Sequence, residues 1–287
     1  ELREAIAAKL KRENGLDYSP DDISTGIGGK GALFTLFQVL IDPGDEVLIP
    51  APYWVSYPEM ARLAEGVPVI ADAGEENDFK LTLEQLDKAI TPKTRLVVLN
   101  SPGNPTGSVY TPDELAALAD VIVRRNVCVV SDEIYEHLVY DGVEQRSIAS
   151  FGPEIKRLTI VCNGFAKAYS MTGWRLGYLA GPADIIKAVN KHHSHSTSGP
   201  ASFVQKAGAA ALNGPQDTVE TMRVEFDKRR RYMVERLNSL PGVTCRVPRG
   251  AFYAFPSIAG WIGRELAGRR ITGSLALACP PRQPLSH

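Results

Sequence analysis

Apolar segments rich in β-branched residues alternate along this chain with segments in which apolar residues recur at helical spacing. The short apolar runs predict strands at residues 46–49, 67–71, 96–99, 127–130 and 159–162. The helical spacing predicts helices at residues 33–40, 57–64, 82–89 and 112–125. This alternation predicts an α/β fold of three layers, α/β/α, with a mainly parallel sheet covered by helices on both faces. Functional residues of such sheets lie beyond the carboxyl ends of the strands.

The pattern changes near Gln216. A long helical segment rich in Arg and Glu spans residues 217–240, and a strand-like segment (243–247) and an aromatic run (252–255) follow. We therefore expect residues 1–215 to form a large domain and residues 216–278 a partial, smaller α+β domain. Residues 279–287 carry three prolines and no periodicity, and we expect an unrelated tail there. Because helical periodicity begins at Glu1, without an N-cap, we expect the sequence to be a fragment.

The composition is that of an ordinary globular protein: 287 residues, 44% hydrophobic and 23% charged. A formal net charge of -1 gives no electrostatic reason to expect binding to nucleic acid or to an anionic membrane. The apolar runs are shorter than a membrane-spanning helix requires. The four cysteines lack Cys-x-x-Cys spacing, and two lie in apolar runs, which favours reduced, buried thiols and a cytoplasmic location.

Lys167 lies in an apolar and small-residue stretch, residues 165–178, and Arg175 follows eight positions later beside two glycines. Burial lowers the pKa of a lysine, and the uncharged amine can then attack a carbonyl. A fixed guanidinium nearby suits a phosphate. The alternative is a surface lysine with a buried stem, followed by a packing corner.

Two further turns carry polar groups. The run Gly28-Gly29-Lys30-Gly31 opens a helix, whose exposed amides can bind phosphate, although a plain turn is equally compatible. Asp132 follows the predicted strand 127–130, and Tyr135 comes three residues later. A carboxylate there can keep a pyridine nitrogen protonated, and a phenol can bond a ring oxygen. The alternative for Asp132 is a helix N-cap.

Asn104 precedes a proline, which disfavours helical geometry and lets its amide point into a cleft; a simple turn is the alternative. Trp54 offers an aromatic face after the strand at 46–49, with ordinary core packing as its alternative. Together these residues meet the needs of a planar, phosphorylated pyridine cofactor: a phosphate cradle, a stacking face, an anion for the ring nitrogen, a donor for the ring oxygen and a covalent lysine.

Four stretches of the sequence carry a specific resemblance to a known family: residues 51–57, 100–107, 131–136 and 163–178. The chain resembles the fold-type I pyridoxal 5'-phosphate enzymes and, within them, the class I/II aminotransferases. It is most similar to the bacterial aspartate aminotransferase subgroup, from residue 1 to about residue 278. The resemblance implies an aspartate aminotransferase-like large domain, pyridoxal phosphate as cofactor, and a homodimer.

The resemblance implies a role for each matching residue. Lys167 forms the Schiff base with the cofactor and moves the α-proton, and Asp132 pairs with the ring nitrogen. Tyr135 and Asn104 bind the ring oxygen, and Trp54 stacks on the ring. These assignments make Lys167, Asp132 and Tyr135 the catalytic residues.

The same resemblance assigns the phosphate to Gly29, the Lys30 backbone and Arg175. Trp54 and Asn104 also border the substrate carboxylate. Lys30 is expected to reach the distal carboxylate of an acidic substrate, which favours aspartate or glutamate. Cis peptides are expected before Pro52 and Pro105.

The predicted function is transamination between an acidic amino acid and a 2-oxo acid. The family places a substrate glycine and a tyrosine before the position of Glu1, and a carboxylate-binding arginine after that of Ala278; Arg282 takes no such role. Two alternatives are a pyridoxal phosphate β-lyase for sulfur amino acids and a non-catalytic, cofactor-sensing domain of a transcription regulator.

Two polar clusters are set aside. The histidines at 192, 193 and 195 have no further ligand at metal-binding spacing, so we expect a polar loop there and no metal. The basic run at 228–231 alternates with acidic residues, which predicts a solvated helix face rather than a nucleic-acid site.

Overall fold

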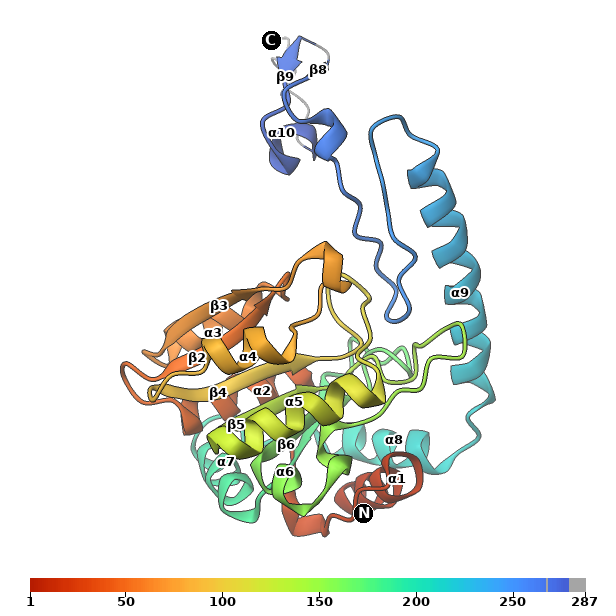
Figure 1. Ribbon diagram of the computed structural model, residues 1–287. Helices are drawn as coiled ribbons and strands as arrows, with labels where there is room; N and C mark the ends of the chain where they lie inside the picture. Colours follow the sequence, from red (N-terminus) through yellow and green to blue (C-terminus); the bar gives the residue numbers. More distant parts are fainter. Residues whose placement is uncertain (267, 279–287) are drawn as a thin grey trace, which may run out of the picture.

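The computed structural model describes residues 1–266 and 268–278, and its main feature is a seven-stranded sheet (Figure 1). The strand order is β1-β7-β6-β5-β4-β2-β3. The strands are β1 (Ile23–Ile27), β2 (Glu46–Ala51), β3 (Val67–Asp72), β4 (Thr94–Asn100), β5 (Cys128–Asp132), β6 (Thr159–Gly164) and β7 (Leu176–Ala180).

The pairing of the strands confirms a mainly parallel sheet. Strands β3, β2, β4, β5 and β6 pair in parallel, whereas β7 is antiparallel to both β6 and β1. The five predicted strands are all present, with ends that differ by one or two residues. Strands β1 and β7 were not predicted, because polar residues or glycine interrupt their apolar patterns. These residues are Ser24, Thr25 and Gly26 in β1, and Gly177 in β7.

Helices cover both faces of the sheet and form the outer layers of the predicted α/β/α fold. The helices are α1 (Leu2–Asn14), α2 (Gly28–Leu40), α3 (Ser56–Leu63), α4 (Leu83–Ala89), α5 (Pro112–Arg125), α6 (Pro153–Leu158), α7 (Ala183–His195), α8 (Ser202–Asn213), α9 (Asp217–Asn238) and α10 (Ser274–Ala278). Side-chain alternation along β4 separates the two cores. Leu96 and Val98 pack with α2, α3 and α7, whereas Val97 and Leu99 pack with α4, α5 and α6. Helices α1 and α8 pack against β1, β6 and β7.

The C-terminal part departs from its predicted form. Helix α9 runs along the side of the layered body, and a long loop after it returns toward the sheet (Figure 1). The strand predicted at 243–247 is wrong, because Thr244 makes only an isolated bridge to Ser257. Short strands β8 (Glu265–Leu266) and β9 (Arg269–Arg270) lie beyond this loop. The division near residue 215 stays a prediction, and the tail at 279–287 lies outside the described residues.

The histidine cluster at 192–195 and the basic run at 228–231 both lie in surroundings that differ from the predicted ones. The three histidines belong to the last turn of α7 rather than to a loop, and His193 is buried against Ser24. Within residues 1–266 and 268–278 there is no group of side chains able to hold a metal ion. The basic run lies on α9, as expected, but Arg230 is not solvated. Its side chain is 2% exposed and pairs with Asp141 and Asp227, since α9 packs here against the loop after β5.

The cysteines match their predicted state where they are described. Cys162 and Cys245 are buried, Cys128 is half-buried, and all three are free thiols. Cys279 lies outside the described residues. Among the helices that the structure describes, none combines the length and apolar character needed to cross a bilayer.

Candidate active site

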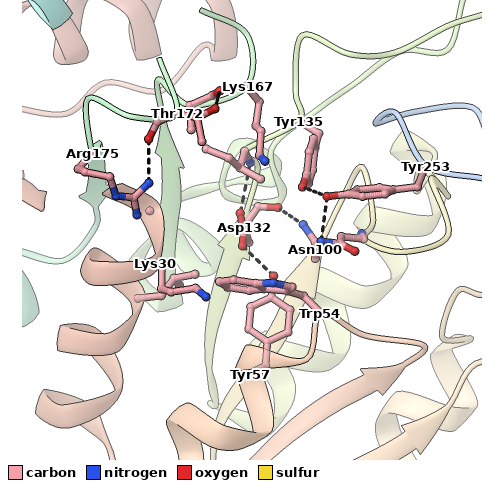
Figure 2. A pocket seen from close by; sticks show the side chains of 15 residues that line it. Lys30, Trp54, Tyr57, Asn100, Asp132, Tyr135, Lys167, Thr172, Arg175 and Tyr253 are labelled. Carbon is pink, nitrogen blue, oxygen red and sulfur yellow. Dashed lines mark hydrogen bonds between the residues drawn. The ribbon is translucent and has the colours of Figure 1, made fainter. Parts of the chain in front are cut away.

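A cavity of ≈ 310 Å³ lies at the edge of the sheet where the parallel strands end (Figure 2). Its walls hold the eight residues singled out from the sequence: Gly29, Lys30, Trp54, Asn104, Asp132, Tyr135, Lys167 and Arg175. The lining also contains Leu33, Tyr57, Asn100, Ile134, Ala166, Thr172 and Tyr253. The fold therefore brings residues that are far apart in the sequence into one site.

Strand direction explains why these residues meet. Asp132 is the last residue of β5, and Lys167 lies in the turn that follows β6, the next strand in the sheet. Strand β7 is antiparallel to β6, so its first residues lie at this same edge. Arg175 immediately precedes β7. It therefore lies at the cavity because β7 begins there, whereas Asp132 and Lys167 lie there because β5 and β6 end there.

The N-terminus of α2 and Arg175 form one end of the cavity. The amide of Gly28 donates to the Arg175 carbonyl at 2.8 Å, and the Arg175 guanidinium donates to the Thr172 carbonyl at 2.9 Å. A Cβ on Gly177 would lie 2.3 Å from the Gly29 nitrogen, so only glycine allows β7 to approach the helix this closely. The later amides of this helix start, at Gly29 and Lys30, lie beside a guanidinium, an arrangement that suits an anion such as a phosphate.

Asp132 lies deeper in the cavity and is 4% exposed. Its carboxylate accepts hydrogen bonds from the Tyr57 hydroxyl at 2.7 Å and from the Ile134 amide at 3.3 Å. Burial raises the pKa of Asp132 to about 6, and these two bonds oppose that rise. The helix N-cap alternative is wrong, because residues 134–137 form turns and no helix begins there.

Lys167 is half-buried, and its Nζ faces aromatic rings. The nitrogen lies 5.6 Å from the ring centroid of Tyr135 and 5.2 Å from that of Phe252. Burial lowers the pKa of Lys167, and the positive charge of Arg175 lowers it further, whereas Asp132 opposes the change. The direction predicted from the apolar neighbours of this lysine is confirmed, and it favours a nucleophilic amine.

Tyr135, Asn104 and Tyr253 form a hydrogen-bonded cluster at the other end of the cavity. The hydroxyl oxygens of the two tyrosines lie 2.5 Å apart, and Asn104 Nδ2 donates to the Tyr253 hydroxyl at 3.1 Å. The backbone amide of Asn104 donates to Asn100 Oδ1 at 2.8 Å, and this bond holds the loop that carries Asn104. The peptide bonds before Pro52 and Pro105 are cis, as the resemblance implied.

Trp54 and Lys30 lie at the mouth of the cavity. The Trp54 ring packs edge-on against Tyr57, with centroids 5.2 Å apart, and this contact fixes its orientation. Lys30 Nζ lies 4.8 Å from the Trp54 ring centroid. Since Lys30 is an exposed residue, its ammonium group is a cation available to an anionic ligand.

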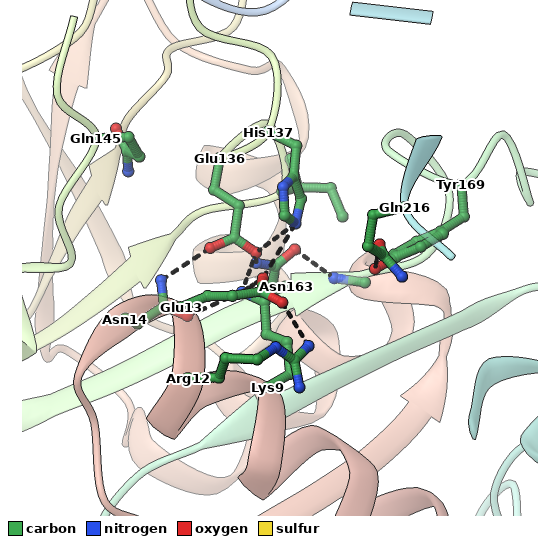
Figure 3. A network of polar contacts seen from close by, with 12 residues as sticks. Lys9, Arg12, Glu13, Asn14, Glu136, His137, Gln145, Asn163, Tyr169 and Gln216 are labelled. Atoms are coloured by element: carbon green, nitrogen blue, oxygen red, sulfur yellow. Dashed lines mark hydrogen bonds and ion pairs between the residues drawn. The ribbon is translucent and has the colours of Figure 1, made fainter. Parts of the chain in front are cut away.

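A polar network joins helix α1 to the turns next to the cavity (Figure 3). Glu136 follows Tyr135 directly and accepts hydrogen bonds from Lys9, from Asn14 at 2.9 Å and from Asn163 at 2.6 Å. Asn163 lies in β6 just before the turn that carries Lys167. The network therefore ties α1, the Tyr135 turn and the Lys167 turn together.

Sequence reasoning did not single out Tyr57, Asn100, Thr172 or Tyr253. Tyr57 and Asn100 lie within the stretches that carried the resemblance, yet their spacing alone shows no partner for either side chain. Tyr253 belongs to the aromatic run at 252–255, more than a hundred residues from Tyr135. Only the return of the loop after α9 brings it to the cavity.

Comparison with known proteins places this site in a family. Residues 1–266 match the family described as aminotransferase class I and II. An aspartate aminotransferase of Geobacillus stearothermophilus is 54% identical over 256 residues, which are 89% of this chain and 65% of that protein. An aspartate/prephenate aminotransferase of Cereibacter sphaeroides is 50% identical over 280 residues, 97% of this chain and 70% of that protein.

A solved structure shows the same fold. The crystal structure of the aspartate aminotransferase from Rhizobium meliloti superposes with a TM-score of 0.94 at 44% identity, covering 96% of this chain and 70% of that one. The chain thus spans about two thirds of the length of the curated relatives it matches.

The family is pyridoxal phosphate dependent, and the cavity fits that cofactor by its own chemistry. One end of the cavity offers the amides of α2 and the guanidinium of Arg175, which lie together because Gly177 lets β7 approach the helix closely. A buried carboxylate, an indole ring and an amine of lowered pKa lie between that end and the phenol cluster. From its matched sequence, its fold and this cavity, the chain belongs to the class I and II aminotransferase family.

Proposed function

We propose that this chain carries the cofactor-binding centre of an aminotransferase that transfers an amino group from an acidic amino acid to a 2-oxo acid. The observation that carries the proposal is the placement of Lys167, Asp132 and Arg175 around one cavity, at the ends of three neighbouring strands. The names of the relatives, aspartate and aspartate/prephenate aminotransferases, support the same reaction and substrate class. The relatives named above support neither the β-lyase nor the regulator alternative.

Bound pyridoxal phosphate would supply an aldehyde and an electron sink for the electrons of the substrate Cα–H bond. Arg175 and the amides of Gly29 and Lys30 would hold its phosphate, and Asp132 would keep its ring nitrogen protonated. Tyr135 and Asn104 would hold the ring oxygen, and Trp54 would pack on the ring face.

Lys167 has two tasks in this proposal. Its lowered pKa gives the uncharged amine that carries the cofactor. Once substrate has released that amine, Lys167 Nζ takes the proton from the substrate Cα as a general base. Both tasks require the neutral form, which burial and Arg175 favour.

The substrate class rests on Lys30. Its ammonium group at the mouth of the cavity, beside Trp54, can bind the distal carboxylate of aspartate or glutamate. We expect Lys30→Met to raise KM for aspartate about tenfold or more, the loss of one charge-assisted hydrogen bond, while KM for alanine changes little.

We also propose a homodimer in the cytoplasm. Ile27, Trp174 and Phe203 are 38%, 46% and 68% exposed and line a groove beside Arg175, a surface suited to a second copy of the chain. Free, buried Cys162 and Cys245 support a reducing compartment. Sedimentation of the wild type and of Phe203→Asp tests the dimer, since the added charge should yield monomers.

The main test uses the purified protein loaded with pyridoxal phosphate and reduced with borohydride. Mass spectrometry should find a pyridoxyl group on Lys167 and none in Lys167→Ala. Aspartate and 2-oxoglutarate should give ping-pong kinetics. Pyruvate release from cystathionine without an oxo acid would instead support the β-lyase, and cofactor binding without turnover would support a sensing domain.

A further inference from the structure

Tyr253 is a cavity residue whose part in the reaction neither the sequence pattern nor the relatives' names indicate. Its ring reaches the cavity from the loop after α9 and lies beside Tyr135 (Figure 2). Its hydroxyl touches both Tyr135 and Asn104. These are the two residues proposed to hold the ring oxygen of the cofactor. Any role of Tyr253 toward the cofactor therefore rests on the proposed function.

The contact between the two phenols uses only one of their two hydroxyl hydrogens. Each phenol carries one hydrogen, and burial raises the pKa of both Tyr135 and Tyr253, so both stay protonated at neutral pH. The bond of 2.5 Å between their oxygens uses one hydrogen, and either hydroxyl can be its donor. One hydroxyl hydrogen therefore remains for a third group, and residues 1–266 and 268–278 contribute no acceptor for it.

The contact with the Asn104 side chain is compatible with the direction that suits a ligand at Tyr135. Asn104 Nδ2 donates to the Tyr253 oxygen at 3.1 Å, so Tyr253 can accept from Asn104 and donate to Tyr135. The hydrogen of Tyr135 is then free to point at a ligand oxygen in the cavity. In such a chain of hydroxyls each bond polarises the next and strengthens the last donor.

We propose that Tyr253 is a positioning residue that directs the Tyr135 hydroxyl toward the ring oxygen of the bound cofactor and strengthens that hydrogen bond. In this role Tyr253 acts through Tyr135. Packing holds the arrangement in place, because Phe252 lies edge-on to Tyr135, with centroids 5.4 Å apart, and stacks on Phe226 of α9. The loop after α9 thereby completes a site built mostly by the sheet.

Pyridoxine 5'-phosphate is the probe for this role, because it keeps the ring hydroxyl and phosphate but lacks the aldehyde and cannot react with Lys167. Its dissociation constant for the cofactor-free protein is measured by calorimetry, beside that of its analogue without the ring hydroxyl. We expect Tyr253→Phe to weaken pyridoxine phosphate about three- to tenfold, the worth of one hydrogen bond, and to leave the analogue unchanged. Tyr232→Phe, which alters a tyrosine on α9 that is 66% exposed, is the matched control and should change neither value.

A double mutant separates this role from simple packing. If Tyr253 acts through Tyr135, then Tyr253→Phe should cost nothing further in a Tyr135→Phe background. In the complete holoenzyme, Tyr253→Phe should also raise the pH at which the visible absorption of the bound cofactor titrates, since a weaker donor stabilises the ring oxygen anion less.

Several outcomes would overturn the inference. Equal weakening of both probes, or additive losses in the double mutant, would mean that Tyr253 only packs. Unchanged binding in Tyr253→Phe, with a wild type that binds pyridoxine phosphate tightly, would remove Tyr253 and leave the proposed function intact. A wild type that binds neither probe would overturn the proposed function, and with it this inference.

Discussion

The Tyr57 hydroxyl donates a hydrogen bond of 2.7 Å to the buried carboxylate of Asp132. Tyr57 belongs to α3 and is 2% exposed, whereas Asp132 ends β5, so the bond joins two elements across the floor of the cavity. The bond favours the ionised carboxylate and opposes the burial that raises its pKa to about 6. The charge proposed to hold the ring nitrogen thus depends on a phenol that the sequence pattern did not single out.

Removing that phenol should make cofactor binding more sensitive to acid. In Tyr57→Phe the pKa of Asp132 should rise above about 6, so the carboxylate is neutralised at a higher pH. We expect pyridoxine phosphate to bind several-fold more weakly at pH 6.5 and nearly normally at pH 8.5. Calorimetric titration across this range is the measurement, and a loss of affinity independent of pH would contradict the explanation.

The close approach of β7 to α2 predicts that a single added methyl group disturbs the phosphate end, the end of the cavity formed by Arg175 and the start of α2. A Cβ at Gly177 would lie 2.3 Å from the Gly29 nitrogen and 2.6 Å from the Gly28 carbonyl carbon, both backbone atoms that cannot move aside alone. Gly177→Ala should therefore displace the helix start and weaken pyridoxine phosphate by tenfold or more. The same assay with inorganic phosphate as competitor shows whether the phosphate end is the part affected.

Gly173→Ala is the matched control, because it lies in the same segment with no atom within 4 Å of its added Cβ. It should bind the ligand as the wild type does. Equal losses in the two variants would mean that the segment at 165–178 tolerates no added side chain at all, and that the approach of β7 to α2 has no special part.

The network next to the cavity predicts a large difference between two lysines of α1. Lys9 and Glu136 have side chains that are 2% and 8% exposed, so Lys9→Met leaves a buried carboxylate without its lysine partner. We expect a loss of about 3–5 kcal/mol in the free energy of unfolding, measured by urea denaturation. Lys11→Met, on the same helix but with a side chain that is 70% exposed, should cost less than about 1 kcal/mol. A small effect of Lys9→Met would show that water reaches Glu136.

Glu133 should make the protein less stable as the pH rises toward neutrality. Burial, with a contribution from Glu136, raises the pKa of Glu133 from 4.5 to about 7, and its Oε2 has no hydrogen-bond partner. Between these two pH values the folded protein keeps a proton that the unfolded chain has released. The free energy of unfolding therefore rises as the pH falls through this window, by on the order of 3 kcal/mol in total.

Glu133→Gln should remove this dependence, because the amide does not titrate. Urea denaturation at intervals between pH 5 and pH 8 measures the slope of the free energy of unfolding against pH. Glu84→Gln, at an exposed position on α4, is the control and should keep the slope of the wild type. An unchanged slope in Glu133→Gln would assign the titration to another buried group.

The layered α/β architecture could be predicted from the pattern of side chains alone. Buried parallel strands have to be apolar over most of their length, and the helices between them have to bury one face, so β2, β4, β5, β6 and α5 left clear patterns in the sequence. Strands β1 and β7 did not, because short strands with glycine and polar residues resemble loops locally. Their place in the sheet depends on pairing with each other and with β6.

The eight residues chosen from the sequence could be recognised as a set because each stands beside a strand end or a glycine turn. What the sequence by itself determined is the kind of chemistry, namely an amine among apolar neighbours, an acid after a strand, and a guanidinium between glycines. Only the tertiary structure decided their partners, joining Tyr57 to Asp132, Tyr253 to Tyr135, and Lys9 to Glu136. The physical reason is that local pattern encodes burial and turn geometry, whereas hydrogen bonds across 75 to 127 residues depend on where the folded chain returns.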